Sequence, residues 1–181
     1  MATINNKRTQ ITKQLFHQSL IKLLESKTMN EISIKMICEE AELNRSTFYL
    51  HYDSPYDLLK EIQSDVIEKS IEYLLQVQKG TDSMLFIQKF LSYIKDNTYI
   101  FKVLLNDSNS SYFIDEYIQV TQKVALKDIK SSEKKKTEPY LNTFVMQGCF
   151  NVIKQWIQKD FDLSEKELSD FIFRLCKKCY L

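Results

Sequence analysis

The sequence is poor in the two residues that most often interrupt helices. Its 181 residues include only two glycines and two prolines. Tight β-hairpins depend on glycine at positive φ, and the usual Asn-Gly and Asp-Gly pairs do not occur. The shortage argues against an all-β fold and permits long helices. Because 44% of the residues are hydrophobic, the chain can bury a substantial core, and we expect an all-α fold.

Long apolar runs are missing as well. No run reaches the ~18 residues that cross a bilayer, and the polar start of the chain lacks the apolar segment of a signal peptide. We therefore expect a cytoplasmic protein with no membrane contact, whose four cysteines are reduced thiols. The formal net charge is only +1, so a nucleic-acid partner would depend on a local arrangement of residues.

The motifs of common enzymes and metal sites are also lacking. No glycine-rich phosphate loop, Gly-x-Ser-x-Gly or His-Glu-x-x-His sequence occurs. His17 and His51 are the only histidines, too few for a metal cluster. Cys176 and Cys179 have Cys-x-x-Cys spacing, but a second ligand pair or a thioredoxin-like context is missing, so buried thiols are expected. The sequence predicts no metal, no cofactor and no catalytic site.

Hydrophobic periodicity predicts three helices in the first 51 residues. An apolar stripe indicates an amphipathic helix over residues 9–26. Ser33 and Asn44 are N-cap candidates for two short helices, over residues 34–42 and 45–51. The two short helices are separated by a tight turn.

A clear boundary follows at Ser54 and Pro55. With Asp57 they form a capping-box-like start for a long helix over residues 55–78, which Gly80 is suited to end as a C-cap. The lysine-rich run 131–136 is expected to be a solvated loop. Further helices are expected near residues 82–96, 98–105, 111–129, 138–159 and 164–179.

Two short helices behind a longer one are the parts of a helix-turn-helix. Apolar residues at 37, 41, 43 and 48 would pack these helices together, and the small Cys38 and Ala41 would allow a close crossing. Phe48 would point inward, leaving the polar positions 45, 46, 47 and 49 outward. Arginine suits bidentate hydrogen bonds to guanine or phosphate, and hydroxyl groups suit phosphate oxygens.

The chain resembles the TetR family of transcription regulators, most clearly in residues 32–52, which read ISIKMICEEAELNRSTFYLHY. The similarity covers about residues 7–68. Gly148, followed by Trp156 and Ile157, is similar to a C-terminal variety of the same family. The resemblance implies a helix-turn-helix DNA-binding domain over residues 7–53, with a signature extending to about 68. It also implies a helical dimerisation and ligand-binding domain over residues 54–181.

The resemblance further implies the residues that contact a double-stranded DNA operator. Ser33 and Lys35, at the first short helix, would touch phosphate. The side chains of Arg45, Ser46, Thr47 and Tyr49 in the second short helix would face the major groove. Tyr49, His51 and Tyr52 would hold the adjacent DNA strand. Lys7 and Arg8 would form a basic arm near the duplex. The implied DNA-binding residues are Ser33, Lys35, Asn44, Arg45, Ser46, Thr47, Tyr49, His51, Tyr52 and Lys60.

Two departures from the family pattern stand in this region. Glu42 occupies the turn position where the family usually has glycine, and a non-glycine residue in a left-handed conformation costs roughly 1–2 kcal/mol. Pro55 and Tyr56 stand where a lysine is often found, so Tyr56 or Lys60 would have to replace one phosphate contact. Residues 1–53 carry seven basic and six acidic side chains, so affinity would rest on a few placed contacts.

One helix-turn-helix reads few bases, so such proteins commonly pair across a palindromic operator. The resemblance implies a homodimer in which the last two helices form a four-helix bundle with their mates. The residues expected at this interface are Phe144, Gly148, Val152, Trp156, Phe171 and Leu175. A place in the core of a single chain is the alternative for these side chains.

The middle of the chain is rich in aromatic residues. In the family, the corresponding helices enclose a cavity for a small effector, which here would be apolar or aromatic. The residues implied for this pocket are Phe90, Tyr93, Phe101, Phe113 and Tyr117. An aromatic stripe at helical spacing is more often plain core, which is the alternative for these residues.

The sequence therefore predicts a DNA-binding transcriptional regulator, by default a repressor that a small effector releases from its operator. An activator of the same family is one alternative. A helical interaction module that has lost DNA binding is another, because residues 1–53 carry little net charge and Glu42 is acidic. A helical enzyme is a third, although no catalytic constellation supports it.

Overall fold

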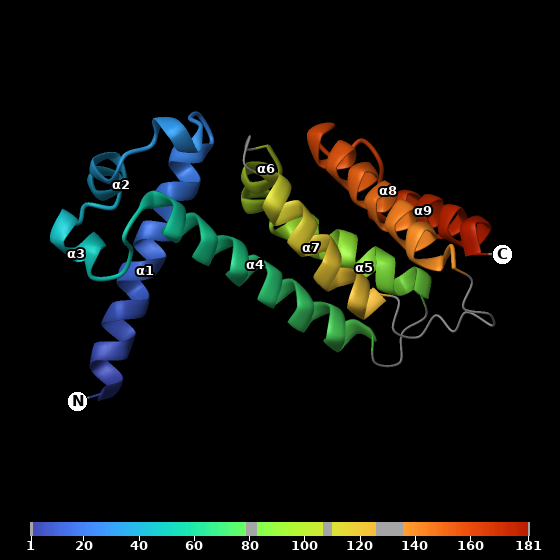
Figure 1. Ribbon diagram of the computed structural model, residues 1–181, viewed down its shortest axis with the longest axis horizontal. Coiled ribbons are helices and arrows are strands. Elements are labelled where there is room, and N and C mark those ends of the chain that lie inside the picture. Colours follow the sequence, from blue (N-terminus) through green and yellow to red (C-terminus); the bar gives the residue numbers. More distant parts are fainter. Residues whose placement is uncertain (1, 79–82, 107–109, 126–135, 181) are drawn as a thin grey trace. The chain divides into compact units, whose positions relative to one another are not determined.

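The computed structural model describes residues 2–78, 83–106, 110–125 and 136–180. In these residues the fold is all-α, as predicted, with nine α-helices, one 3-10 turn at Met29–Glu31, and no strand (Figure 1). None of the described helices is both long and apolar enough to span a membrane. The helices are α1 (Ala2–Leu24), α2 (Ile34–Glu40), α3 (Arg45–Tyr49), α4 (Pro55–Gln78), α5 (Ser83–Asp96), α6 (Thr98–Asn106), α7 (Ser110–Ala125), α8 (Glu138–Gln158) and α9 (Glu165–Tyr180).

Most helix limits agree with those predicted from sequence, and α1 is the main exception. It begins at Ala2 rather than at residue 9, and no glycine or proline between these positions would stop it. At the start of α4, the Ser54 hydroxyl accepts a hydrogen bond from the Asp57 N–H at 3.3 Å and donates to the Asp57 carboxylate at 2.7 Å. Gly80, the end of the helix predicted to reach residue 129, and most of the lysine-rich run lie outside the described residues.

The chain divides into two compact units, and α4 contributes residues to both. One unit comprises Met1–Val66 with Asn106–Ser110, and the other Ile67–Leu105 with Ser111–Leu181. The domain boundary after residue 53 stays a prediction.

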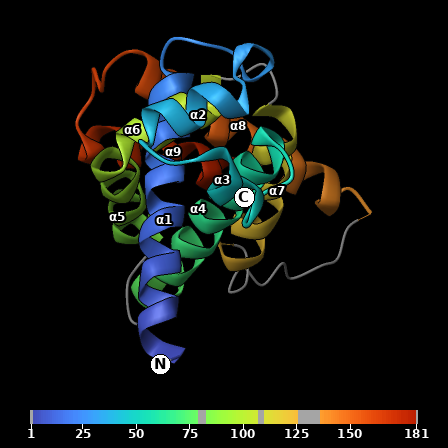
Figure 2. The same cartoon turned by 90° about the vertical axis from the view of Figure 1, so that its left-hand side faces the viewer.

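The first unit is built around an aromatic contact between α1 and the end of the helix-turn-helix. Phe16 and Leu20 lie one turn apart on α1 and are fully buried. The Phe16 ring meets Phe48 edge-on at 5.3 Å and Tyr52 at 6.2 Å between centroids. Since α2 contacts both α1 and α3 (Figure 2), this core fixes the two short helices on the long first one.

The second unit is a helical bundle in which α5 and α8 both pack against α9 (Figure 1). Its core is a mixture of aliphatic and aromatic side chains. The buried residues include Leu91, Ile94, Phe101, Leu104, Phe113, Tyr117, Ile153, Trp156, Leu168 and Ile172.

Helix α8 ends in a Schellman motif made without glycine. The N–H of Asp160, at φ 51°, bonds to the Ile157 carbonyl at 3.2 Å, and the N–H of Phe161 bonds to the Trp156 carbonyl at 2.9 Å. The Phe161 ring packs edge-on against the Trp156 ring, with 4.7 Å between the ring centroids. An apolar contact of this kind often accompanies a Schellman motif. The Trp156 Nε1–H donates to the Leu163 carbonyl at 2.7 Å, so this side chain is satisfied within its own chain.

Candidate nucleic-acid interface

The turn between α2 and α3 sets the direction of the second short helix. Ser33 caps α2 as predicted, accepting a hydrogen bond from the Met36 N–H at 3.3 Å. At the other end, Glu42 has φ 55°, and the Leu43 N–H bonds to the Cys38 carbonyl at 3.0 Å. The turn is therefore a second Schellman motif, with glutamate at the position that favours glycine.

Helix α3 is held to its unit by Phe48, which is fully buried and points inward as predicted. Asn44 occupies the N-cap position with extended backbone, but its side chain makes no capping hydrogen bond. This differs from the capping role expected for Asn44, and it leaves the exposed side chain available at the start of the helix.

Apart from Phe48, the surface of α3 is largely open to solvent. Arg45 and Ser46 are exposed, Thr47 is half-buried, and the Tyr49 side chain is 59% exposed. Leu50, which the sequence analysis did not single out, is 79% exposed beside Tyr49. Side chains two residues apart point to opposite sides of a helix. Because Phe48 is predicted to point inward, the sequence could have predicted an exposed Leu50.

Tyr52 does not share that open surface. Only 4% of it is exposed, its hydroxyl donates to Glu61 at 3.0 Å, and the same hydroxyl lies 3.4 Å from His17 Nε2. His51 beside it is half-buried. The DNA-strand contact implied for Tyr52 therefore has no exposed hydroxyl to make it, because tertiary packing directs this hydroxyl to α1 and α4.

Glu61 is the centre of a polar cluster that joins α1 to α4. Its carboxylate accepts hydrogen bonds from Lys13 Nζ at 2.8 Å and from the Tyr52 hydroxyl, and it lies 3.0 Å from His17 Nε2. Burial alone would raise the pKa of Glu61, but the hydrogen bonds from Lys13, Tyr52 and His17 together hold it below the usual value. Burial, with the neighbouring Glu61, raises the pKa of Tyr52. The cluster thus holds one ionised carboxylate and one neutral phenol at neutral pH.

The residues proposed to replace the missing lysine differ in their surroundings. The Tyr56 hydroxyl donates to Asn30 Oδ1 at 2.6 Å, so it is occupied within the protein. Lys60 is exposed on α4, and Lys7 and Arg8 are exposed on α1. Of the two candidates, Lys60 is the side chain left free to meet a phosphate.

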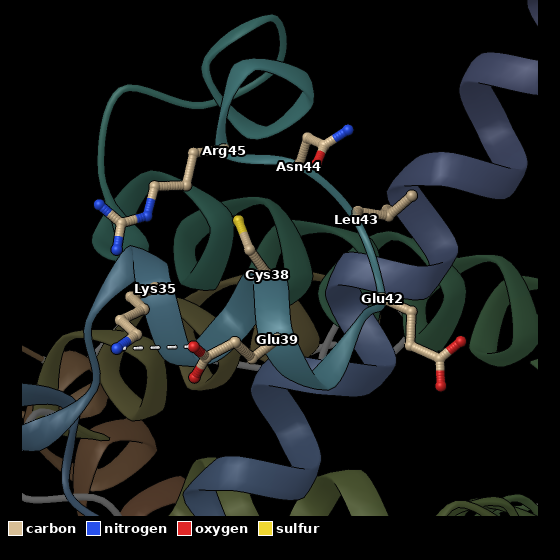
Figure 3. A pocket seen from close by; sticks show the side chains of 7 residues that line it. All are labelled: Lys35, Cys38, Glu39, Glu42, Leu43, Asn44 and Arg45. Carbon is tan, nitrogen blue, oxygen red and sulfur yellow. Dashed lines mark ion pairs between the residues drawn. The ribbon is translucent and has the colours of Figure 1, made fainter.

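A shallow hollow lies between α2 and the start of α3 (Figure 3). Lys35 and Arg45 extend to one side of it, whereas Glu42 points to the other. Lys35 pairs with Glu39 at 3.7 Å across an exposed helix turn, and Glu40 of the same helix pairs with Lys22. Two of the acidic groups on α2 are therefore partly neutralised by lysines, which keeps the surface beside α3 from being strongly acidic.

The residues expected at a dimer interface fall into two groups. Phe144 is 71% exposed, and Gly148, Phe171 and Leu175 are exposed as well. A Cβ added at Gly148 would meet no atom within 4 Å, so nothing in the described part of its own chain requires glycine there. Val152 is half-buried and Trp156 is buried in the core of its unit, as the alternative explanation for these positions expected.

The five residues expected to line an effector pocket lie together around Tyr117. Its ring centroid is 5.6 Å from that of Phe113, 5.9 Å from Phe101 and 6.5 Å from Phe90, and Tyr93 meets Phe101 at 6.2 Å. Phe101, Phe113 and Tyr117 are buried, while the other two are half-buried. In this conformation the rings pack against one another as an aromatic core.

The cysteines are arranged in a way that the sequence did not indicate. Cys38 is buried, but Cys149, Cys176 and Cys179 are only half-buried, which corrects the expectation of buried thiols for the Cys-x-x-Cys pair. The sulfur atoms of Cys149 and Cys176 lie 3.6 Å apart. Among the described residues, no three His, Cys, Asp or Glu side chains are grouped to hold a metal ion.

Comparison with known proteins agrees with the fold and with the helix-turn-helix. A family model for the C-terminal region of TetR-type transcriptional regulators matches residues 81–178. A curated relative, the HTH-type transcriptional regulator YxbF of Bacillus subtilis, is 21% identical over 164 residues. That match covers 87% of this chain and 43% of the relative, so the chain spans less than half of the relative's length.

Solved structures share the same architecture. A TetR transcriptional regulator from Streptococcus agalactiae superposes with a TM-score of 0.75 at 21% identity, over 97% of this chain and 99% of that one. The fatty acid degradation regulator FadR from Bacillus halodurans has a TM-score of 0.67 at 12% identity, over 91% of this chain and 94% of that one. The dihydroxyacetone kinase operon activator DhaS has a TM-score of 0.65 at 17% identity, over 94% of this chain and 96% of that one. At these identities the structures show the fold alone.

The geometry and the comparisons agree on one family. The chain has a short helix anchored by Phe48 behind a tight turn, and it has the nine-helix fold of solved regulators within its described residues. The family model covers more than half of the sequence. The protein therefore belongs to the TetR family of transcriptional regulators.

Proposed function

We propose that the protein binds a palindromic operator in double-stranded DNA as a homodimer and places α3 in the major groove. The observation that carries this proposal is the contrast in exposure between Phe48 and the other side chains of α3. Phe48 is fully buried, while Arg45, Ser46 and Tyr49 are open to solvent. A rigidly anchored short helix with an arginine in its first turn suits direct reading of base edges.

Phosphate contacts would position this helix on the duplex. Lys35 and Lys60 are exposed, and the Tyr49 hydroxyl extends from the same face as Arg45. Such contacts set affinity and register but do not select sequence. Because residues 1–53 carry a net charge of only +1, we expect few phosphate contacts per subunit and a shallow dependence of affinity on salt.

Selection from a pool of randomised duplexes tests the proposal, followed by affinity measurement on the selected sequence. Arg45→Ala should weaken binding by about 1–3 kcal/mol and relax the preference at one position in each half-site. Tyr49→Phe should weaken binding while preserving sequence preference, because it removes only a hydroxyl. Lys89→Ala, which removes an exposed positive charge from α5, is the control and should bind like the parent. Equal binding by all four proteins would contradict the proposed recognition helix.

The dimer would form through the open faces of α8 and α9. Tyr140, Phe144, Phe171 and Leu175 are large exposed apolar side chains on these two helices. Isolated subunits rarely leave such a group uncovered, and the exposed Gly148 would allow a close approach by a partner helix. Two DNA-reading modules per assembly would then match a two-fold symmetric operator.

We further propose that a small apolar or aromatic effector binds at the aromatic cluster around Tyr117. To enter, it would have to displace rings that now contact one another, so the liganded state would differ in the packing of this unit. An effector shifts DNA affinity only by its difference in affinity for the two states. A thermal-shift screen followed by operator-binding assays tests this step. A compound that binds the cluster but leaves DNA affinity unchanged would contradict effector control.

The sign of regulation is a separate question. Repression is the expectation from the family resemblance, and activation is the second candidate, since one structural neighbour is named as an operon activator. A reporter gene placed behind the selected operator distinguishes them, because deletion of the regulator raises expression in the first case and lowers it in the second. Either outcome implies a cytoplasmic location, where the DNA lies. A chain that selects no duplex would instead favour an interaction module that has lost DNA binding.

A further inference from the structure

The seam between α8 and α9 contains a pair of thiols in direct contact. Cys149 lies on α8 and Cys176 on α9, and their sulfur atoms are 3.6 Å apart. Both side chains are half-buried in the single chain, where a small solute can reach them. Cys179 stands one helical turn after Cys176 and is half-buried too. Because the two thiols lie on different helices, their contact depends on how α8 and α9 pack.

We propose that Cys149 and Cys176 form an oxidant-sensitive dithiol site, which a hydroperoxide converts reversibly into a disulfide joining α8 to α9. Bond formation needs the sulfur atoms to approach from 3.6 Å to about 2.05 Å. Because α8 and α9 already pack together, we expect rotation of the two side chains to close this gap. The proposal does not depend on operator binding and stands or falls separately from it.

The two sulfurs differ in their readiness to react. A hydrogen bond with Cys149 lowers the pKa of the Cys176 thiol, whereas the hydrogen bond with Cys176 and burial raise the pKa of Cys149. Thiolates are the reactive form of cysteine, so Cys176 is the sulfur expected to be oxidised first. Cys38 differs from both, because burial raises its pKa and leaves little surface for attack.

The reaction proceeds in two steps that balance. The Cys176 thiolate attacks a peroxide oxygen, the O–O bond breaks, and Cys176 becomes a sulfenic acid while the alkoxide or hydroxide leaves and takes up a proton. The Cys149 sulfur then loses its proton and attacks the sulfenic sulfur. The new S–S bond forms as hydroxide departs and is protonated to water. Together the two thiols lose two electrons and two protons, and the hydroperoxide is reduced to an alcohol and water.

Peptide mapping of the full chain after exposure to hydrogen peroxide tests the site. Lys177 and Lys178 lie between Cys176 and Cys179, so trypsin places these two cysteines on different peptides. We expect one intramolecular cross-link between the Cys149 and Cys176 peptides, its loss after treatment with dithiothreitol, and a free Cys38. A cross-link to Cys179, a bond between two chains on a non-reducing gel, or Cys149 and Cys176 recovered as free thiols would each overturn the proposal.

Variants give a second readout. Oxidation should raise the thermal unfolding midpoint of the parent on the order of 5–10 °C, because the bond closes a loop of more than 25 residues. Cys149→Ser should lose both the cross-link and the shift, with Cys149→Ala as a second replacement and circular dichroism as a check that each variant folds. Cys179→Ser is the matched control and should keep both. An equal shift in the parent and in Cys149→Ser would show that another modification causes it.

Discussion

Glu42 shows how a single backbone position carries the geometry of the helix-turn-helix. The turn needs a left-handed residue, and Glu42 supplies it at φ 55° although its side chain disfavours that conformation. The hydrogen bond from Leu43 to Cys38 and the packing of Phe48 hold the turn in place. The same solution recurs at Asp160 after α8, so scarcity of glycine does not prevent Schellman turns in this protein.

Replacement of Glu42 by glycine should stabilise the protein. Glu42→Gly relieves the left-handed strain but gives the unfolded chain more freedom, so we expect the free energy of unfolding to rise by about 1 kcal/mol or less. Urea denaturation measures the change. Glu42→Gln removes the same charge but keeps a side chain at φ 55°, and it should show no gain. A comparable gain in both variants would mean that charge, and not backbone strain, is what the substitution relieves.

At the scale of secondary-structure elements, the polar cluster around Glu61 connects α1 to α4. Lys13 and His17 come from α1 and Tyr52 follows α3, so one carboxylate meets groups from three segments. Its low pKa means that the ionised form is favoured in the folded protein. The stability contributed by Glu61 is therefore fully present above the unfolded pKa of about 4.5 and is lost as the pH falls through the lower folded value.

This linkage predicts a pH-dependent effect of Glu61→Gln. At pH 7 the variant should lose about 1–3 kcal/mol of unfolding free energy, because Lys13 and the Tyr52 hydroxyl lose a charged acceptor. Below pH 4 the difference from the parent should shrink, since the parent's own carboxyl becomes protonated. Denaturation curves between pH 3 and 7 measure it. Glu68→Gln, which changes an exposed carboxylate on the same helix, should have little effect at any of these values.

At the scale of the whole molecule, the proposed binding of a palindromic operator requires two copies of the chain. Phe144 on α8 is 71% exposed, and Phe171 and Leu175 on α9 are 41% and 44% exposed. Covering a large apolar side chain is worth roughly 1.5–3 kcal/mol, and a two-fold interface would bury each of them twice. This unpaired surface is the reason to expect that the assembly, and not the single chain, is the DNA-binding species.

Phe144→Asp should therefore shift the protein toward monomer. A charge in the middle of an apolar interface should raise the dimer dissociation constant by at least about tenfold, which corresponds to 1.4 kcal/mol. Sedimentation equilibrium measures the constant. Tyr99→Asp is the control, because Tyr99 is an exposed aromatic residue on α6, outside the proposed interface. A parent protein that is already monomeric, or a Phe144→Asp variant that dimerises like it, would contradict the proposed interface.

Much of the candidate interface could be predicted because its causes are local. The Ser33 cap, the start of α4 at Pro55 and the inward direction of Phe48 follow from the types and spacing of neighbouring residues. The roles of Tyr52 and Trp156 could not be predicted in this way. Tyr52 is a polar aromatic residue at the end of an exposed helix, and only the approach of Glu61 from α4 shows that its hydroxyl points inside.

The amino-acid order by itself determined the helical fold, most of the helix limits and the exposed character of Arg45, because helix formation depends on hydrophobic period, caps and missing breakers. The tertiary structure decided which side chains meet across distance. Glu61 joins Lys13 over 48 positions, and Cys149 meets Cys176 over 27. Such contacts depend on how helices pack, and packing is set by the sum of many weak side-chain contacts that no short stretch of sequence contains.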